Sequence, residues 1–237
     1  MIRYFRPHME ILPPAQKKLW PLLGRAPELG MVLYGGTAIA LRVGHRFSVD
    51  FDFFTDAPLD KKTLRDSFPY LRQSTVIQED LNTLTVLVPS GRTSGAYVKV
   101  SFFGRIGFGR VGEPELTEDG MLQVASLDDL MATKLKVILQ RIEAKDYTDI
   151  AAMIKAGASL GKGLASARKI YGKNFQPSES LKAMVYFEGG DLHLLSSEVR
   201  EVLIKAASSV RDLPSVVLAS GNLALPIGKC KPEAGRR

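Results

Sequence analysis

The chain has 237 residues, of which 45% are hydrophobic and 24% charged, and a net charge of +7. The length allows one large domain or one domain with an appendage, and the composition excludes a disulfide-stapled miniprotein and a broadly disordered chain. Because Cys230 is the single cysteine and no run approaches the roughly 18 apolar residues of a membrane span, we expect a cytoplasmic protein without membrane contact.

The first predicted elements are a helix, a strand and a second helix. A leucine-containing stretch within residues 14–24 follows two prolines and favours a short helix. Residues 31–34 form a compact apolar run, typical of a buried strand, that ends at Gly35 and Gly36. Thr37 is a candidate cap for a second short helix, which we expect to end at Gly44.

Residues 48–53 alternate strictly between polar and apolar side chains, which predicts a half-buried strand. Val49, Phe51 and Phe53 then share one face, and Ser48, Asp50 and Asp52 share the other. Turn residues and β-rich runs predict further strands and one more helix. The expected strands are 73–79, 83–88 and 96–103, and the expected helix is 61–68. The first half is therefore predicted to be mixed α/β with a mainly antiparallel or mixed sheet.

From Ser126 the pattern becomes helical, after a sequence that resembles a capping box. We expect helices over 127–142 and 146–156, further helices to about residue 210, and a frayed tail after Gly228. The predicted organisation is an α/β (α+β) core, residues 1–125, whose mixed sheet is flanked by helices. A helical region, residues 126–237, completes the site.

The positive charge is concentrated near the C-terminal end. Residues 155–237 carry 13 lysines and arginines against 7 acidic residues, whereas residues 1–154 carry 19 against 18. Such an excess can steer a polyanion towards this region. The alternative is a set of solvated, lysine-rich helix faces without a ligand.

Asp50 and Asp52 are candidate metal ligands. Two residues apart on a strand, they project from the same face, about 6.5 to 7 Å apart along the backbone. Two such carboxylates can bind Mg²⁺, which prefers a few carboxylates, waters and substrate phosphate oxygens. The alternative is an exposed strand face that carries two acids without a ligand.

The glycine turn before this strand is a candidate phosphate site. Backbone N–H groups of Gly35 and Gly36 and the Thr37 hydroxyl can bind phosphate oxygens, aided by the positive end of a helix. A tight turn without a ligand is the alternative. His45 and Arg46 could contact phosphate or base, or form only a surface loop.

Three separated motifs resemble one known family. They read LYGGTAIAL over residues 33–41 with GHRFSVDFDFF over 44–54, DLMATKL over 129–135, and RIEAKDYTD over 141–149. In this order the motifs resemble those of the AbiEii/AbiGii-type nucleotidyltransferase toxins of the polymerase-beta-like superfamily. The resemblance spans about residues 30–155, roughly half the chain.

The resemblance implies a minimal nucleotidyltransferase core that transfers a nucleoside monophosphate from an NTP and releases pyrophosphate. By this resemblance the glycine turn and Ser48 hold the nucleotide, and Asp50 and Asp52 bind Mg²⁺ as catalytic residues. Lys134 and Arg141 contact the phosphates. Asp146 or Asp149 orients the acceptor or holds the lysine.

Without the resemblance, Lys134 and Arg141 are seven residues apart on one helix face and can be a solvated basic stripe. The resemblance further implies a toxin–antitoxin or phage-defence setting, a cognate antitoxin protein, and RNA or tRNA as acceptor. A small-molecule hydroxyl is the alternative acceptor.

One residue departs from the superfamily pattern. A third catalytic carboxylate often comes from a later strand, but the best candidate strand has Ser101 at that place. A hydroxyl cannot supply the negative charge that would hold a second Mg²⁺. The alternatives are therefore catalysis with a single metal, a carboxylate recruited from elsewhere such as Asp146, or a non-catalytic protein that binds nucleotide, RNA or a partner protein.

Overall fold

The computed structural model describes residues 2–91 and 95–226. The expectations about Cys230 and about a frayed tail after Gly228 lie outside the described residues. Among the described residues, no helix combines the length and the apolar character needed to cross a bilayer.

A single mixed sheet of eight strands organises the fold. Its spatial order is β1-β7-β8-β2-β3-β6-β5-β4, so that β3 lies between β2 and β6. β3 runs antiparallel to β2 and parallel to β6. The strands are β1 (Tyr4–Phe5), β2 (Val32–Tyr34), β3 (Asp50–Phe54), β4 (Thr75–Asp80), β5 (Thr83–Pro89), β6 (Tyr97–Phe103), β7 (Glu115–Thr117) and β8 (Gln123–Val124).

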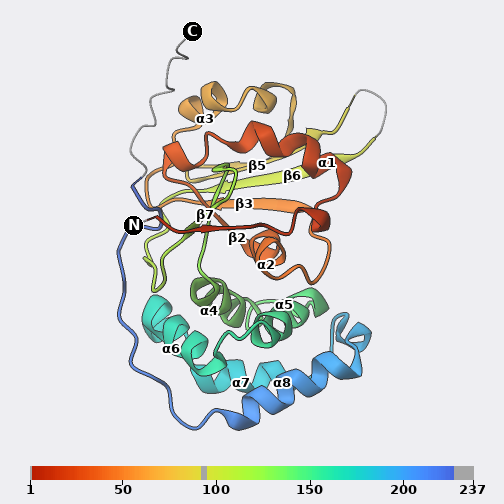
Figure 1. Ribbon diagram of the computed structural model, residues 1–237, viewed down its shortest axis with the longest axis vertical. Coiled ribbons are helices and arrows are strands. Elements are labelled where there is room, and N and C mark those ends of the chain that lie inside the picture. Colours follow the sequence, from red (N-terminus) through yellow and green to blue (C-terminus); the bar gives the residue numbers. More distant parts are fainter. Residues whose placement is uncertain (1, 92–94, 227–237) are drawn as a thin grey trace.

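Helices cover both faces of this sheet (Figure 1). α1 and α3 lie on one side; α2 lies on the other, with α4 and α5 beyond it, and α7 and α8 lie farthest from the sheet. The helices are α1 (Pro14–Leu19), α2 (Gly35–Val43), α3 (Lys61–Ser67), α4 (Leu127–Val137), α5 (Ala144–Lys155), α6 (Leu160–Tyr171), α7 (Pro177–Val185) and α8 (Ser197–Ser209). The mixed α/β fold class is confirmed.

An aromatic core fills the α1/α3 side of the sheet. Phe51, Phe53 and Phe102 are almost fully buried there. Trp20 packs on Phe51 with ring centroids 6.3 Å apart, and Phe68 packs on Phe102 at 5.6 Å. Because strand side chains alternate, this burial directs the polar residues of β3 towards α2, α4 and α5.

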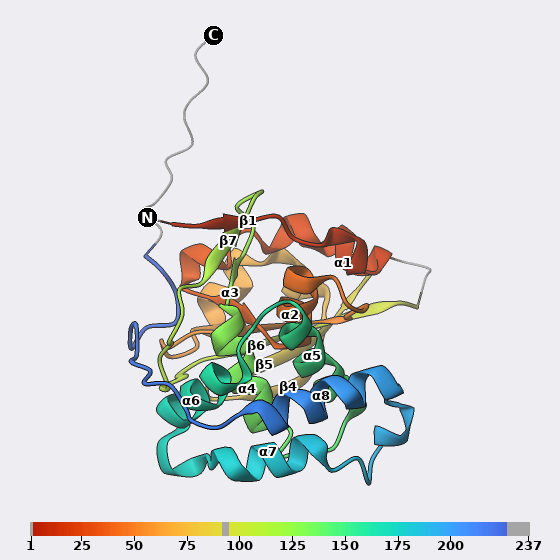
Figure 2. The ribbon, with the colours of Figure 1, turned by 60° about the horizontal axis from the view of Figure 1, so that its bottom comes forward.

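The helical region is tied back to the sheet by the chain after α8. Figure 2 shows this segment running past α6 to the sheet edge near β7. There Arg110 and Ser220 form a β-bridge, Gln123 exchanges two hydrogen bonds with the backbone of Leu225, and Leu223 is fully buried. We call residues 211–226 the C-terminal strap. The domain boundary at residue 125 stays a prediction, and α2 contacts both α4 and α5 across it.

Several local expectations are wrong. Thr37 does not cap α2, because the helix begins at Gly35 and the Thr37 hydroxyl instead donates to the main-chain carbonyl of Asp50. Val49 does not share the buried face, since pairing with β6 begins only at Asp50 and Val49 is exposed. The expected helix over 127–142 is too long, since α4 ends at Val137.

Other expectations are confirmed. α2 ends against Gly44, whose φ of +66° lies in the left-handed region. The Ser126 hydroxyl caps α4 by accepting from the Asp129 N–H at 3.1 Å. The helices α6, α7 and α8 fall within the predicted helical stretch to residue 210. The short strands β1, β7 and β8 were not predicted.

Candidate active site

Asp50 and Asp52 lie together on the face of β3 that points away from the aromatic core. In the parallel pairing with β6, Asp50 is opposite Lys99 and Asp52 is opposite Ser101. Both aspartates are partly exposed. The sheet register therefore places two carboxylates, one ammonium and one hydroxyl on the same face.

The two aspartates have different surroundings. Asp50 Oδ2 lies 2.8 Å from the Lys99 ammonium, an ion pair that the sequence analysis missed. Burial raises the pKa of Asp52, and the negative charge of Asp50 raises it further. The charge of Lys99 and a hydrogen bond with Ser101 oppose this rise without cancelling it. A cation at this pair of carboxylates would relieve their repulsion.

The glycine turn lies directly against Asp52. Gly35 has a φ of +75°, and a Cβ there would lie 2.6 Å from Asp52 Oδ2. A Cβ on Gly36 would lie 2.5 Å from Nη2 of Arg46. The positive φ of Gly35 therefore requires glycine beside the carboxylate, whereas Gly36 lies close to the end of the Arg46 side chain. The start of α2, a positive charge and a metal-binding candidate thus lie beside one another.

Thr37 and Ser48 stabilise this turn through buried hydrogen bonds. Both side chains are buried, and their hydroxyls are hydrogen-bonded to each other at 2.7 Å. Since Thr37 also donates to the carbonyl of Asp50, the pair ties the first turn of α2 to the beginning of β3. In this structure both hydroxyls bind protein atoms.

A buried lysine joins α4 to α5. Lys134 Nζ lies 2.5 Å from Asp146 Oδ1 and 2.6 Å from Asp149 Oδ2, and both carboxylates are fully buried. The alternative of a solvated basic stripe is therefore wrong for Lys134. Arg141 lies beyond the end of α4, so the two do not share a helix face, yet its guanidinium reaches Asp146 at 2.8 and 3.1 Å.

Asp149 is the meeting point of Lys134, Arg46 and His45. His45 Nε2 and Arg46 Nε each lie 2.7 Å from Oδ1, and Arg46 Nη2 donates to Oδ2 at 3.0 Å. Burial by itself raises the pKa of Asp149, but these hydrogen bonds and the charges of Lys134 and Arg46 reverse the effect and hold the pKa well below its usual range. His45 and Arg46 are thus more than a surface loop.

Asp146 is held ionised in a similar way. Burial acts to raise its pKa, while the hydrogen bond from Arg141 and the charge of Lys134 outweigh burial and lower it. The Lys134 charge also acts on Asp52, so the α4/α5 network and the β3 aspartates share one electrostatic field. Arg46 links the two parts, since it hydrogen-bonds to Asp149 and its guanidinium lies beside Gly36.

The donor set fits a cation such as Mg²⁺. Asp50 and Asp52 offer two hard oxygen ligands on one face, and no group of three or more His, Cys, Asp or Glu with metal-site geometry occurs in the part of the chain that the structure describes. Two carboxylates leave coordination positions for water and substrate phosphate, the arrangement that Mg²⁺ prefers over a closed protein cage.

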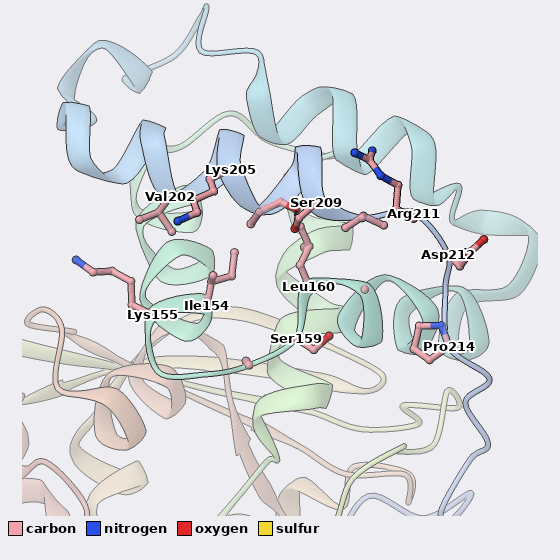
Figure 3. Close-up of a pocket in the computed structure, with 14 residues that line it drawn as sticks. Ile154, Lys155, Ser159, Leu160, Val202, Lys205, Ser209, Arg211, Asp212 and Pro214 are labelled. Atoms are coloured by element: carbon pink, nitrogen blue, oxygen red, sulfur yellow. Dashed lines mark hydrogen bonds between the residues drawn. The ribbon is translucent and has the colours of Figure 1, made fainter.

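A separate cavity of about 620 Å³ lies between α5, α6 and α8. Figure 3 shows apolar side chains such as Ile154, Leu160 and Val202 along it, with the ammonium groups of Lys155 and Lys205 at one side. None of the predicted site residues lines it. The chemistry-bearing residues are therefore gathered at β3, α2, α4 and α5 and not in this cavity.

Known proteins are similar to this chain in sequence and in fold. The family model "Nucleotidyl transferase AbiEii toxin, Type IV TA system" matches residues 22–208, which include every residue of the site. An uncharacterized protein of Aquifex aeolicus is 33% identical over 159 residues, which cover 66% of this chain and 73% of that protein.

The fold is similar to a solved structure, the nucleotidyltransferase toxin MenT4 of Mycobacterium tuberculosis. The TM-score is 0.56 and the sequence identity 14%, and the match covers 83% of this chain and 84% of that one. At this identity the likeness concerns the fold.

Proposed function

The chain belongs to the AbiEii family of nucleotidyltransferase toxins, and from this premise we propose that it transfers a nucleoside monophosphate from an NTP to an RNA acceptor, with tRNA as the favoured class, in a reaction that requires Mg²⁺. The observation that carries the proposal is the convergence of the glycine turn, Asp50 and Asp52, and the buried Lys134 network. Each part matches one need of phosphoryl transfer: a phosphate cradle, a metal site and fixed positive charge.

The residues of the turn bind and orient the nucleotide in this proposal. The N–H groups at the start of α2 and the Arg46 guanidinium face phosphate oxygens, and the buried Thr37 and Ser48 keep the turn rigid. Asp50 and Asp52 would hold Mg²⁺, which when bound neutralises negative charge on the phosphates. Preformed positive charge lowers the barrier because it needs no reorganisation during the reaction.

Lys134 and Arg141 add further positive charge to the site. Their partners Asp146 and Asp149 hold them in place, and the network is buried, so its field is less screened than that of a surface pair. We assign Asp146 and Asp149 the role of holding the cations. The exposed part of the Arg141 side chain remains available to a substrate phosphate.

RNA is the acceptor that the charge distribution favours. The excess of 13 basic over 7 acidic residues in 155–237 suits a polyanion better than a small hydroxyl compound. The family's toxin–antitoxin setting supports a cognate antitoxin, and we include a role in phage defence in the same proposal.

Pyrophosphate release tests the proposal. Purified protein is incubated with each NTP and with total bacterial RNA, tRNA or a panel of small hydroxyl compounds, with Mg²⁺ or with a chelator. We expect release that requires both Mg²⁺ and RNA and is lost in Asp50→Asn/Asp52→Asn. The control Asp66→Asn changes an exposed carboxylate paired with Arg72 and should keep the activity. Release supported only by small hydroxyl compounds, or unaffected by the chelator, would contradict the proposal.

A further inference from the structure

Lys99 is the charged residue of the catalytic face that the proposed reaction has not used. It lies on β6 opposite Asp50, and its ammonium is 2.8 Å from Asp50 Oδ2. Its charge also lowers the pKa of Asp52, so it acts on both candidate metal ligands. A positive group that contacts one ligand of a cation site competes directly with the cation.

The residue opposite Asp52 explains why the charge of Lys99 matters. Ser101 lies opposite Asp52 and stands where a third carboxylate is expected. Two carboxylates carry two negative charges, which one divalent cation already balances. Because Ser101 is neutral, β3 and β6 offer a second divalent cation no third carboxylate ligand at this face, whereas the Lys99 ammonium is already present there beside Asp50.

The two lysines of the site differ in burial and in the number of their ion-pair partners. Lys134 is held between two buried carboxylates and is 7% exposed. Lys99 has Asp50 as its partner in an ion pair and is 40% exposed. Lys99 can therefore exchange Asp50 for a substrate phosphate oxygen at little cost, while Lys134 cannot leave its partners without uncovering buried charge.

We propose that the site holds one divalent cation and that Lys99 supplies the second positive charge beside Asp50 and Asp52. In the free protein Lys99 forms an ion pair with Asp50. With a divalent cation held by the two aspartates, the Lys99 ammonium would be free to contact the phosphates of the nucleotide. The inference rests on the proposed nucleotidyltransferase function, and it names Lys99 as the residue that makes a single-cation site sufficient.

Manganese binding without nucleotide tests this directly, with free Mn²⁺ measured by electron paramagnetic resonance. Because Lys99→Ala removes the competing charge, we expect Mn²⁺ to bind about three- to tenfold more tightly than to the wild type. Lys99→Arg should stay close to the wild type. In turnover assays kcat should fall in Lys99→Ala although the cation binds better, a combination that loss of a merely structural ion pair does not produce.

The matched control is Lys61→Ala. Lys61 pairs with Glu79 at 3.4 Å on the α3 side of the sheet, so the variant loses the same charge away from the aspartates. We expect no change in Mn²⁺ affinity. An equal gain in both variants, or no gain in Lys99→Ala, would overturn the proposal.

The number of ions gives a second readout. With a non-hydrolysable NTP analogue present, the wild type should bind one Mn²⁺ more than Asp50→Asn/Asp52→Asn, and two more would overturn the proposal. If the wild type binds Mn²⁺ at the aspartates but transfers no label from NTP, the proposed function fails. The affinity comparison of Lys99→Ala then still decides the role of Lys99 as a competitor for Asp50.

Discussion

The carboxylates of the site are balanced unequally by the chain's own cations. Asp146 and Asp149 share Lys134 and have further partners in Arg141, His45 and Arg46. Asp50 has Lys99. Among the residues that the structure describes, Asp52 is the site carboxylate without an ion pair, and its pKa is raised by burial and by Asp50. The electrostatic need for an added cation is therefore concentrated at Asp52.

Replacing Asp149 should destabilise the protein in a pH-dependent way. Asp149→Asn leaves Lys134, Arg46 and His45 without their shared anionic partner, so we expect the free energy of unfolding at pH 7 to fall by about 3–5 kcal/mol. The folded-state pKa of Asp149 is lowered, so its contribution is fully present above the unfolded pKa of about 3.9 and is lost as the pH falls towards the folded pKa.

Urea denaturation at neutral and acidic pH measures this effect. The difference between wild type and Asp149→Asn should be large at pH 7 and should shrink below about pH 4. Asp66→Asn, at an exposed pair, should change the unfolding free energy by less than about 1 kcal/mol at every pH. A difference between wild type and Asp149→Asn that grows on acidification would contradict the assignment.

A site residue could be predicted where the pattern that marks it lies within a short stretch of the sequence. Asp50 and Asp52 were predicted from alternation within one strand, whereas Asp146 and Asp149 were named as candidate partners of Lys134 only through the family resemblance. Lys99 was missed because its role depends on β3 pairing with β6, a contact between strands more than 40 residues apart along the chain. The strand over 96–103 was predicted, but no local pattern fixes its neighbour in the sheet.

At the scale of elements, the backbone conformation of the turn from β2 to α2 shapes both the metal-binding candidate and the phosphate candidate. Gly35 adopts a left-handed φ and leaves room for the Asp52 carboxylate. The same turn begins the helix whose N–H groups we assign to phosphate. A change at this turn therefore alters the metal-binding candidate and the phosphate candidate together.

Gly35→Ala should abolish transfer. The Cβ would lie 2.6 Å from Asp52 Oδ2, and the φ of +75° adds about 1–2 kcal/mol of backbone strain. We expect at least about a hundredfold loss of kcat/KM, on the order of removing one key stabilising group. Gly120→Ala is the control, since Gly120 has a φ of +71° but open space around it. Comparable losses of activity in both variants would show that strain alone is responsible.

Local sequence patterns predict the boundaries of helices and the shortest strands poorly. Apolar spacing predicted α4, but the same spacing continues past Val137, where the chain leaves the helix and brings Arg141 to Asp146. The strands β1, β7 and β8 have two or three residues each, too few for a detectable alternation. They form because the neighbouring chain offers main-chain partners, as in the parallel pairing of β2 with β8.

At the scale of the whole molecule, the site is assembled from two layers that must stay together. Asp50 and Asp52 belong to the sheet, whereas Lys134, Asp146 and Asp149 belong to α4 and α5. The C-terminal strap runs from the end of α8 back to the sheet edge. It therefore helps to hold the helical layer against the layer that carries the aspartates.

Leu223→Ala should weaken this tie. The side chain is fully buried, and the Leu223 N–H donates to Asp56 Oδ1 at 3.0 Å. We expect the free energy of unfolding to fall by about 2–4 kcal/mol in chemical denaturation. Val217→Ala in the same strap, where the side chain is 73% exposed, should change it by less than about 0.5 kcal/mol. Equal stability of wild type and Leu223→Ala would show that the strap is not needed.

The central claim is that the face carrying Asp50 and Asp52 transfers a nucleotide to RNA. The most direct measurement incubates wild type and Asp50→Asn/Asp52→Asn with α-labelled NTPs, Mg²⁺ and total bacterial RNA, and follows the label on a denaturing gel. The account predicts label on RNA with the wild type and none with the double variant. Equal labelling by both proteins, or no labelling of RNA by the wild type with any NTP, would contradict it.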